Sequence, residues 1–141
     1  MTDESMNFEK SCGAIVFTRR DGEIFYVVVE EQAGTHSFPK GHMEGDETEI
    51  ETAKREIFEE TGLRPRFVEG FRMSEEFFPA EKPGTRKQVV YFLAEFGDEP
   101  IIPRENDVRK VMLATYDETL RLIKFEGTRR ILAGAHGFLT K

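Results

Sequence analysis

Cysteine is almost absent from this sequence: the chain has one, Cys12, and therefore cannot form an internal disulfide. Long apolar runs are also missing, since no stretch approaches the ~18 consecutive apolar residues typical of a membrane-spanning helix. The first residues, MTDESMNFEK, are acidic and polar and are unlike a secretory or mitochondrial presequence. We therefore expect a cytoplasmic protein with no membrane partner, in which Cys12 is a small buried side chain.

A surplus of basic residues, which DNA-binding proteins use to neutralise phosphates, is absent as well. The chain has 20 Lys and Arg against 27 Asp and Glu, a formal net charge of −7. Most of the acidic excess lies between Glu44 and Glu60, where eight acids meet two bases. We therefore expect no DNA partner. Lys82, Arg86 and Lys87 form a short stretch without an acid, and this stretch is a candidate phosphate-binding segment.

No linker, internal repeat or low-complexity tract divides the 141 residues, which predicts a single domain over residues 1–141. Apolar runs separated by turn residues indicate strands and helices together, an α/β (α+β) fold. The run IFYVVV is apolar on successive positions, as in a strand covered on both faces, so helices should flank the sheet. The expected strands are 13–17, 24–30, 67–77, 89–96 and 108–114; the expected later helices are 116–123 and 127–135; the expected loops include 32–40 and 78–87.

The most informative segment is residues 41–63, which read GHMEGDETEIETAKREIFEETGL. Asp46 and Glu49 are placed to form a capping box for a helix that begins near Glu47. Gly62 is placed to end that helix with a left-handed cap. An apolar stripe at helical spacing predicts the buried side: Ile50, Ala53 and Ile57.

Three glutamates of this helix, Glu56, Glu59 and Glu60, fall within about 100° of one another at ~100° per residue. Like charges so close together destabilise a helix unless a cation lies among them. Carboxylate oxygens are the ligands that hard divalent cations such as Mg²⁺ prefer. The alternative interpretation is an acidic face that is merely solvated.

Arg55 precedes this cluster and is four residues from both Glu51 and Glu59. A forked pair with one of these glutamates would let Arg55 orient the cluster without taking part in the chemistry. Glu47 lies about two turns earlier. It either interacts with the positive end of the helix dipole or supports Arg55 or a metal.

The fixed spacing of glycine, arginine and glutamate in this segment resembles the Nudix box without a mismatch. The residues that carry the resemblance are Gly41, Glu47, Arg55, Glu56, Ile57, Glu59, Glu60, Gly62 and Leu63. The resemblance implies the Nudix fold, a mixed β-sheet sandwiched between α-helices, and a hydrolase of diphosphate-linked compounds that works with Mg²⁺ or Mn²⁺. It also implies a set of metal ligands: the Gly41 carbonyl, Glu47, Glu56, Glu59 and Glu60.

The same resemblance implies in-line attack of a metal-bound water on phosphorus. The expected catalytic residues are Arg55, Glu56, Glu59, Glu60 and Glu105. Relatives differ in which glutamate is the general base, and both Glu56 and Glu105 remain candidates.

Four further segments, SCGAIVF, FPKGH, EGF and KPGTRKQVVYFLAEF, are similar to the Nudix subgroup that asymmetrically hydrolyses diadenosine tetraphosphate to ATP and AMP. That subgroup usually has Trp or Tyr near Phe38 and Phe78, and Pro-Gly before the first box glutamate, where this chain has Gly45 and Asp46. Phenylalanine can still stack on a base but offers no polar edge. The expected substrate-binding residues are His36, Lys40, Phe78, Lys82, Lys87 and Tyr91.

Two alternatives remain open at this level. One is another Nudix activity, on capped RNA ends, ADP-ribose or diphosphoinositol polyphosphates. The other is a nucleotide-binding sensor without turnover, against which the complete set of box acids argues. For the favoured activity we expect a small-molecule nucleotide as the substrate, and we expect a monomer or a weak homodimer.

Overall fold

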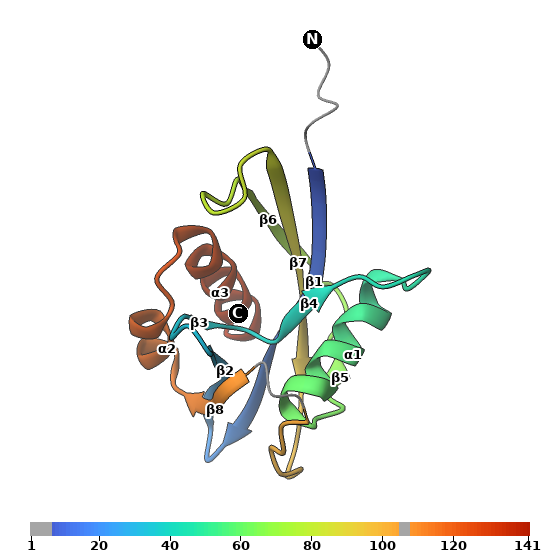
Figure 1. Cartoon of the computed structure of the whole chain (residues 1–141). Helices are drawn as coiled ribbons and strands as arrows, with labels where there is room; N and C mark the ends of the chain where they lie inside the picture. The colour runs from blue at the N-terminus through green and yellow to red at the C-terminus, as the bar shows by residue number, and fades with distance from the viewer. Residues whose placement is uncertain (1–6, 105–107) are drawn as a thin grey trace.

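The computed structural model describes residues 7–104 and 108–141, which form one mixed β-sheet with helices on both faces (Figure 1). The strands are β1 Asn7–Arg20, β2 Glu23–Glu31, β3 His36–Ser37, β4 Lys40–His42, β5 Arg66–Phe67, β6 Met73–Phe77, β7 Thr85–Glu95 and β8 Val108–Ala114. The helices are α1 Glu49–Thr61, α2 Tyr116–Leu122 and α3 Glu126–Leu139. None of the described helices is long and apolar enough to cross a membrane.

Strand β1 organises the sheet because three different strands pair with it. It runs parallel to β7 from the pair Asn7 and Thr85 to the pair Phe17 and Glu95. It is antiparallel to β2 at one end and to the short β4 in its middle. Strand β6 then pairs with β7, and β8 with β2. This arrangement brings β4, and therefore Lys40, against the centre of the sheet.

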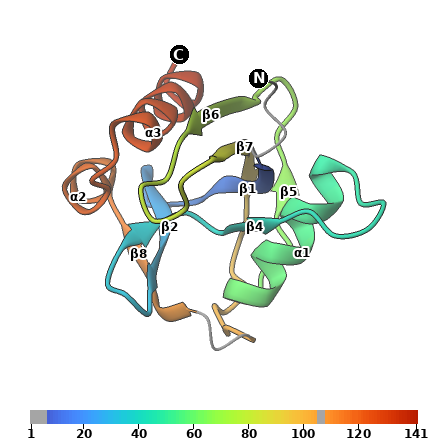
Figure 2. The same cartoon turned by 45° about the horizontal axis from the view of Figure 1, so that its top comes forward.

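Alternate side chains of the central strands fill two separate cores. Cys12 and Ala14 of β1 face α1, where they pack with Ile57, whereas Ile15 faces α2 and α3 and packs in the cluster that includes Ile131. Figure 2 shows the sheet between α1 on one side and the two later helices on the other. The expected sandwich of a mixed sheet between helices is confirmed, and Cys12 is fully buried.

Helix α1 begins two residues later than expected, because its cap is Thr48 and not Asp46. The Thr48 hydroxyl accepts a hydrogen bond from the Glu51 backbone at 3.1 Å, and the Glu51 carboxylate accepts one from the Thr48 backbone at 2.8 Å. The buried side of the helix is also shifted. Ile50, expected inside, is 40% exposed, and Thr52 is buried in its place.

Three strand expectations need correction. The segment 67–77 is two strands, β5 and β6, separated by a bend at Gly70, whose φ of 92° a glycine adopts without strain. The expected loop 32–40 contains β3 and the start of β4. Strands β1 and β7 extend N-terminally beyond residues 13 and 89, because their parallel pairing continues to Asn7 and Thr85.

Helix α3 is fastened to the sheet by a polar contact inside an aromatic cluster. The Tyr26 hydroxyl and His136 Nδ1 lie 2.7 Å apart, a hydrogen bond, and the Tyr116 ring stacks on His136 at 3.8 Å. Burial lowers the pKa of His136 below its usual value, while Asp117 opposes this shift. The docked helix therefore favours the neutral imidazole.

We expect the protein to lose stability on mild acidification because of His136. Its pKa is lower in the folded than in the unfolded chain, where it is about 6.5, so the unfolded state binds more protons. The stabilisation is present above about pH 6.5 and is lost as the pH falls through the folded pKa. Thermal unfolding of the wild type and of His136→Gln from pH 8 to pH 5 measures this, and their difference in melting temperature should shrink by a few degrees. A difference that does not vary with pH would contradict the assignment.

Candidate active site

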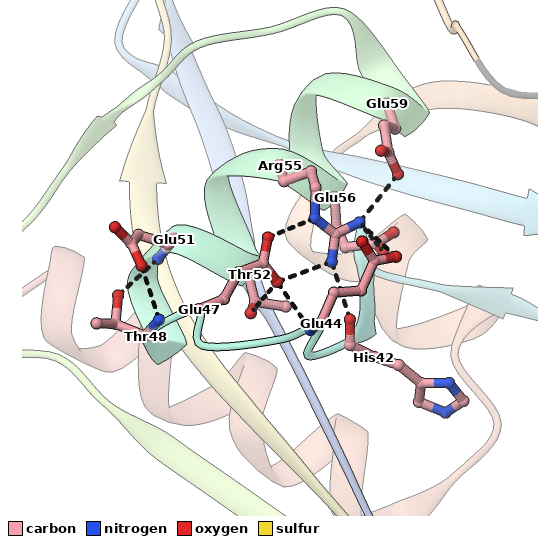
Figure 3. Close-up of polar contacts among 9 residues, drawn as sticks. All are labelled: His42, Glu44, Glu47, Thr48, Glu51, Thr52, Arg55, Glu56 and Glu59. Atoms are coloured by element: carbon pink, nitrogen blue, oxygen red, sulfur yellow. Dashed lines mark hydrogen bonds and ion pairs between the residues drawn. The ribbon is translucent and has the colours of Figure 1, made fainter.

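A single arginine, Arg55, holds acids of the loop before α1 and of the second half of α1 (Figure 3). Arg55 makes a forked pair with Glu47, with Nε to Oε2 at 2.6 Å and an Nη to Oε1 at 3.0 Å. Its other terminal nitrogen reaches Glu56 at 2.9 Å and Glu59 at 3.3 Å. The guanidinium also donates to the His42 carbonyl at 2.9 Å. Arg55 thus fixes the box helix and the preceding loop relative to each other.

Glu47 is the principal partner of Arg55, and Glu51 is not a partner because its carboxylate belongs to the helix cap. The hydrogen bond from Arg55 lowers the pKa of Glu47 to about 2, and a hydrogen bond from the Thr52 hydroxyl, at 2.8 Å, adds to the shift. The pairing with Glu47 also raises the pKa of Arg55. This forked pair therefore keeps its charges over the whole physiological pH range.

Glu56 and Glu60 form the half-buried part of the acid cluster. The two carboxyl groups are close enough for the charge of Glu56 to act on Glu60, and partial burial raises the pKa of both above the usual value. For Glu60 the neighbouring Glu56 raises the pKa further, while a hydrogen bond from the Lys40 backbone opposes the shift. Two oxygen-ligand side chains are thus held together in a poorly solvated place where their negative charges repel each other.

The main chain of β4 passes directly over this pair at Gly41. A Cβ atom at Gly41 would lie 2.1 Å from the carboxyl carbon of Glu56, closer than any real contact. Only glycine therefore lets the strand and the carboxylate approach so closely. Glu59 lies at the edge of the cluster, with a side chain 32% exposed.

The donor set suits a divalent cation, although the acids do not surround one point. Within residues 7–104 and 108–141, no group of three His, Cys, Asp or Glu side chains is arranged to hold a metal ion. Instead, Arg55 occupies one carboxylate oxygen of Glu56 and one of Glu59. Half-buried carboxylates beside a backbone that leaves no room for a side chain provide the oxygen ligands that Mg²⁺ and Mn²⁺ prefer.

A cavity of about 570 Å³ opens between β3, β6, β7 and the start of α3. Four of the expected substrate-binding residues line it: His36, Lys40, Lys87 and Tyr91. Tyr91 is almost fully buried and packs edge-on against Phe38, with ring centroids 6.2 Å apart, so only a small part of it is accessible. A second hollow of about 320 Å³ is lined by Glu60 and shares Glu31 with the first.

The basic groups of the cavity are only weakly neutralised. Lys40 Nζ is 3.6 Å from Glu31, and His36 Nε2 is 3.6 Å from Glu30. Burial lowers the pKa of Lys87, and the nearby positive charge of Lys40 lowers it further. Two lysine side chains close together in a partly buried site are well placed to receive an anion.

Two expected substrate-binding residues do not line this cavity. Phe78 is 66% exposed, and Phe77, the residue before it, lines the cavity instead. Lys82 lies outside the lining and is ion-paired with Glu9 at 3.2 Å. Glu105, the alternative general base, lies outside the described residues.

Phe125 and Glu75 are among the cavity residues that the sequence patterns do not predict. Phe125 is 63% exposed at the start of α3 and makes no side-chain cap. An aromatic residue at a helix start, where a capping side chain is usual, is a signal that could have identified it. Glu75 comes from the middle of β6 and carries no such signal.

Comparison with known proteins places the chain in a family. A family model described as the NUDIX domain matches residues 8–134. The chain belongs to the Nudix family. Its sequence is 32% identical over 144 residues to the asymmetrical bis(5'-nucleosyl)-tetraphosphatase of Sus scrofa, covering 92% of this chain and 95% of the relative. The protein of the same name from Rattus norvegicus is also 32% identical, over 142 residues.

Solved structures show the same fold. The binary complex of Caenorhabditis elegans Ap4A hydrolase has a TM-score of 0.85 at 18% identity, covering 93% of this chain and 97% of that one. The NUDIX domain of Shewanella oneidensis NrtR, complexed with ADP ribose, has a TM-score of 0.75 at 16% identity, covering 96% and 89%. The family expected from the box is confirmed, and Nudix hydrolases generally use divalent metals such as Mg²⁺.

We expect Gly41→Ala to weaken binding of Mn²⁺ at least about tenfold, because the new Cβ must push the Glu56 carboxylate aside. The side chain can swing away, so the melting temperature should change little. Calorimetric titration with Mn²⁺ measures the affinity. Gly137→Ala is the matched control, since a Cβ at Gly137 meets nothing within 4 Å. Equal affinities in the two variants would refute the role given to this close approach.

Proposed function

We propose that this protein is a Mg²⁺- or Mn²⁺-dependent pyrophosphohydrolase that cleaves dinucleoside tetraphosphates asymmetrically, diadenosine tetraphosphate giving ATP and AMP. The observation that carries the proposal is the position of Lys40. Its side chain lines the large cavity, while its backbone N–H contacts Glu60 of the acid pair. One residue thus joins a nucleotide-sized cavity to the candidate metal site, and the full-length relatives bear the matching name.

The cavity is suited to hold one nucleoside of the substrate. Phe77 and Phe125 are large aromatic side chains, 40% and 63% exposed, on two segments that border the same opening. A base stacked on either ring would bury apolar surface that is otherwise in water, typically worth ~1–3 kcal/mol per base. Phe78 remains a candidate for an outer contact.

The phosphate chain would extend from the cavity towards α1. Lys40 and Lys87 are the side chains placed to bind it, with His36 beside them. A phosphate there would relieve the repulsion between the two lysines. Lys82 could bind a phosphate only if its ion pair with Glu9 were broken. Tyr91 forms part of the cavity wall and exposes very little surface to a ligand.

Glu56, Glu60 and the Gly41 carbonyl would hold the metal, with Glu59 at the edge and Glu47 acting through Arg55. When bound, the metal lowers the pKa of a water molecule and stabilises charge on the phosphate oxygens. Glu56 and Glu105 remain the candidates for taking the proton from the attacking water. Lys40 and Lys87 would stabilise the departing nucleotide by neutralising its terminal phosphate.

The proposal also covers the location and oligomeric state of the protein, and one other activity remains a candidate. We infer a cytoplasmic protein with no DNA partner, a monomer or weak homodimer. The second candidate is removal of pyrophosphate from RNA 5' ends. It is favoured by 46% identity to the RNA pyrophosphohydrolase of Xylella fastidiosa, which extends over only 39% of this chain.

We expect Glu60→Gln to lower kcat for diadenosine tetraphosphate by at least about 100-fold, because one buried carboxylate of the site is lost at nearly constant shape. Steady-state assays with Mg²⁺ and identification of ATP and AMP as products measure this. Glu51→Gln, on the same helix, is the control, since glutamine also serves in a capping box.

Normal turnover by Glu60→Gln would overturn the assignment of the site. A panel that includes triphosphorylated RNA, ADP-ribose and a diphosphoinositol polyphosphate tests the substrate. Faster hydrolysis of any of these than of the dinucleoside tetraphosphate would replace the proposed substrate. Binding of nucleotides without turnover by the wild type would favour a sensor.

A further inference from the structure

The cavity contains an acid that the proposed reaction does not use. Glu75 points from β6 towards the start of α3, where its Oε2 accepts a hydrogen bond from the Thr128 hydroxyl at 2.7 Å. Its Oε1 rests against Gly127, where a Cβ would come within 2.3 Å. The carboxylate is therefore fixed in place by contacts on one side while it lines the cavity on the other.

Glu75 has no basic partner among the residues that the structure describes: none of the ion pairs in this part of the chain includes it. An unpaired carboxylate beside a site for polyphosphate would repel the phosphates unless they lie elsewhere. Lys87 is the cross-strand partner of Phe77, and Lys40 lines the same cavity. The two lysines would draw the phosphates towards the Phe77 end of β6, two residues beyond Glu75. The part of a nucleotide that can face Glu75 is then the uncharged base.

The neighbouring aromatic residues set how that base would lie. Phe77 is two residues beyond Glu75 on β6, so both side chains leave the same face of the strand. Phe125 precedes Gly127 and Thr128, the two residues that hold the carboxylate. A base stacked against these phenylalanines would direct one edge towards Glu75.

We propose that Glu75 is a specificity-determining residue that accepts hydrogen bonds from this edge of the base and favours guanine. A carboxylate only accepts hydrogen bonds, and guanine offers two adjacent donors, N1–H and the 2-amino group. Hypoxanthine lacks the amino group. Adenine presents an acceptor at N1, which would face a carboxylate oxygen and repel it. The inference rests on the proposed function in taking the cavity as the nucleoside site. It changes the preferred substrate within that function, from diadenosine tetraphosphate to dinucleoside tetraphosphates that carry guanine.

A comparison of three bases tests the inference. The kcat/KM values for dinucleoside tetraphosphates carrying guanine, hypoxanthine and adenine should rank guanine first in the wild type, about 10- to 100-fold above hypoxanthine. In Glu75→Gln that ratio should fall to within about threefold, since the amide presents a donor where an acceptor is needed. Glu126→Gln changes another acid of the cavity lining, one that is ion-paired with Arg129 and has a side chain 94% exposed, and it should keep the wild-type ratio.

Binding separates this inference from the proposed reaction. Calorimetric Kd values for GMP, IMP and AMP should show the same order in the wild type and lose it in Glu75→Gln, whether or not any dinucleotide is cleaved. A purely structural role, holding α3 against β6, would lower the melting temperature of Glu75→Gln and leave the order of bases unchanged. That result, or no preference for guanine in the wild type, would overturn the inference. Absence of turnover with the guanine order intact would overturn only the proposed reaction.

Discussion

The site depends on one electrostatic constraint: carboxylates gathered on one edge of α1 must be held against their mutual repulsion. Arg55 does this by binding Glu47 in a forked pair and reaching Glu56 and Glu59 with its remaining nitrogen. Because the same guanidinium also holds the His42 carbonyl, the loop before the helix is fixed with it. The deepest pair, Glu56 and Glu60, is left without full compensation, and this is where a divalent cation would relieve the greatest strain.

The sheet brings the parts of the site together from both sides. Strand β4 pairs with β1, and its Gly41 lies against Glu56 of α1. The first residue of β4, Lys40, lines the cavity on the α3 side of the sheet. The parallel pairing of β1 with β7 brings Lys87 to the same level as Glu9. The acids and the cavity therefore belong to different faces of the sheet, and β4 connects them.

Local patterns in the sequence identified the helix, its acids and the sandwich of layers, since helical periodicity and apolar runs are properties of short segments. The sequence pattern favours Asp46 as the cap, but Thr48 is also a good capping residue, and the reciprocal bonds with Glu51 place the cap there. The cavity cannot be predicted from local patterns, because residues far apart in the sequence line it. Glu75 meets Thr128 across 53 positions of sequence, a contact that the packing of α3 against β6 creates. Likewise, strand register, and not composition, places Phe77 in the lining.

The central claim is that the acid edge of α1 holds divalent ions that engage a polyphosphate extending from the cavity. A crystal structure with Mn²⁺ and a non-hydrolysable dinucleoside tetraphosphate tests it most directly. The account predicts anomalous density for Mn²⁺ beside Glu56, Glu60 and the Gly41 carbonyl, with a phosphate in contact with the ion and a base at Phe77 or Phe125. Metal and ligand bound elsewhere, with the acid edge empty, would contradict it.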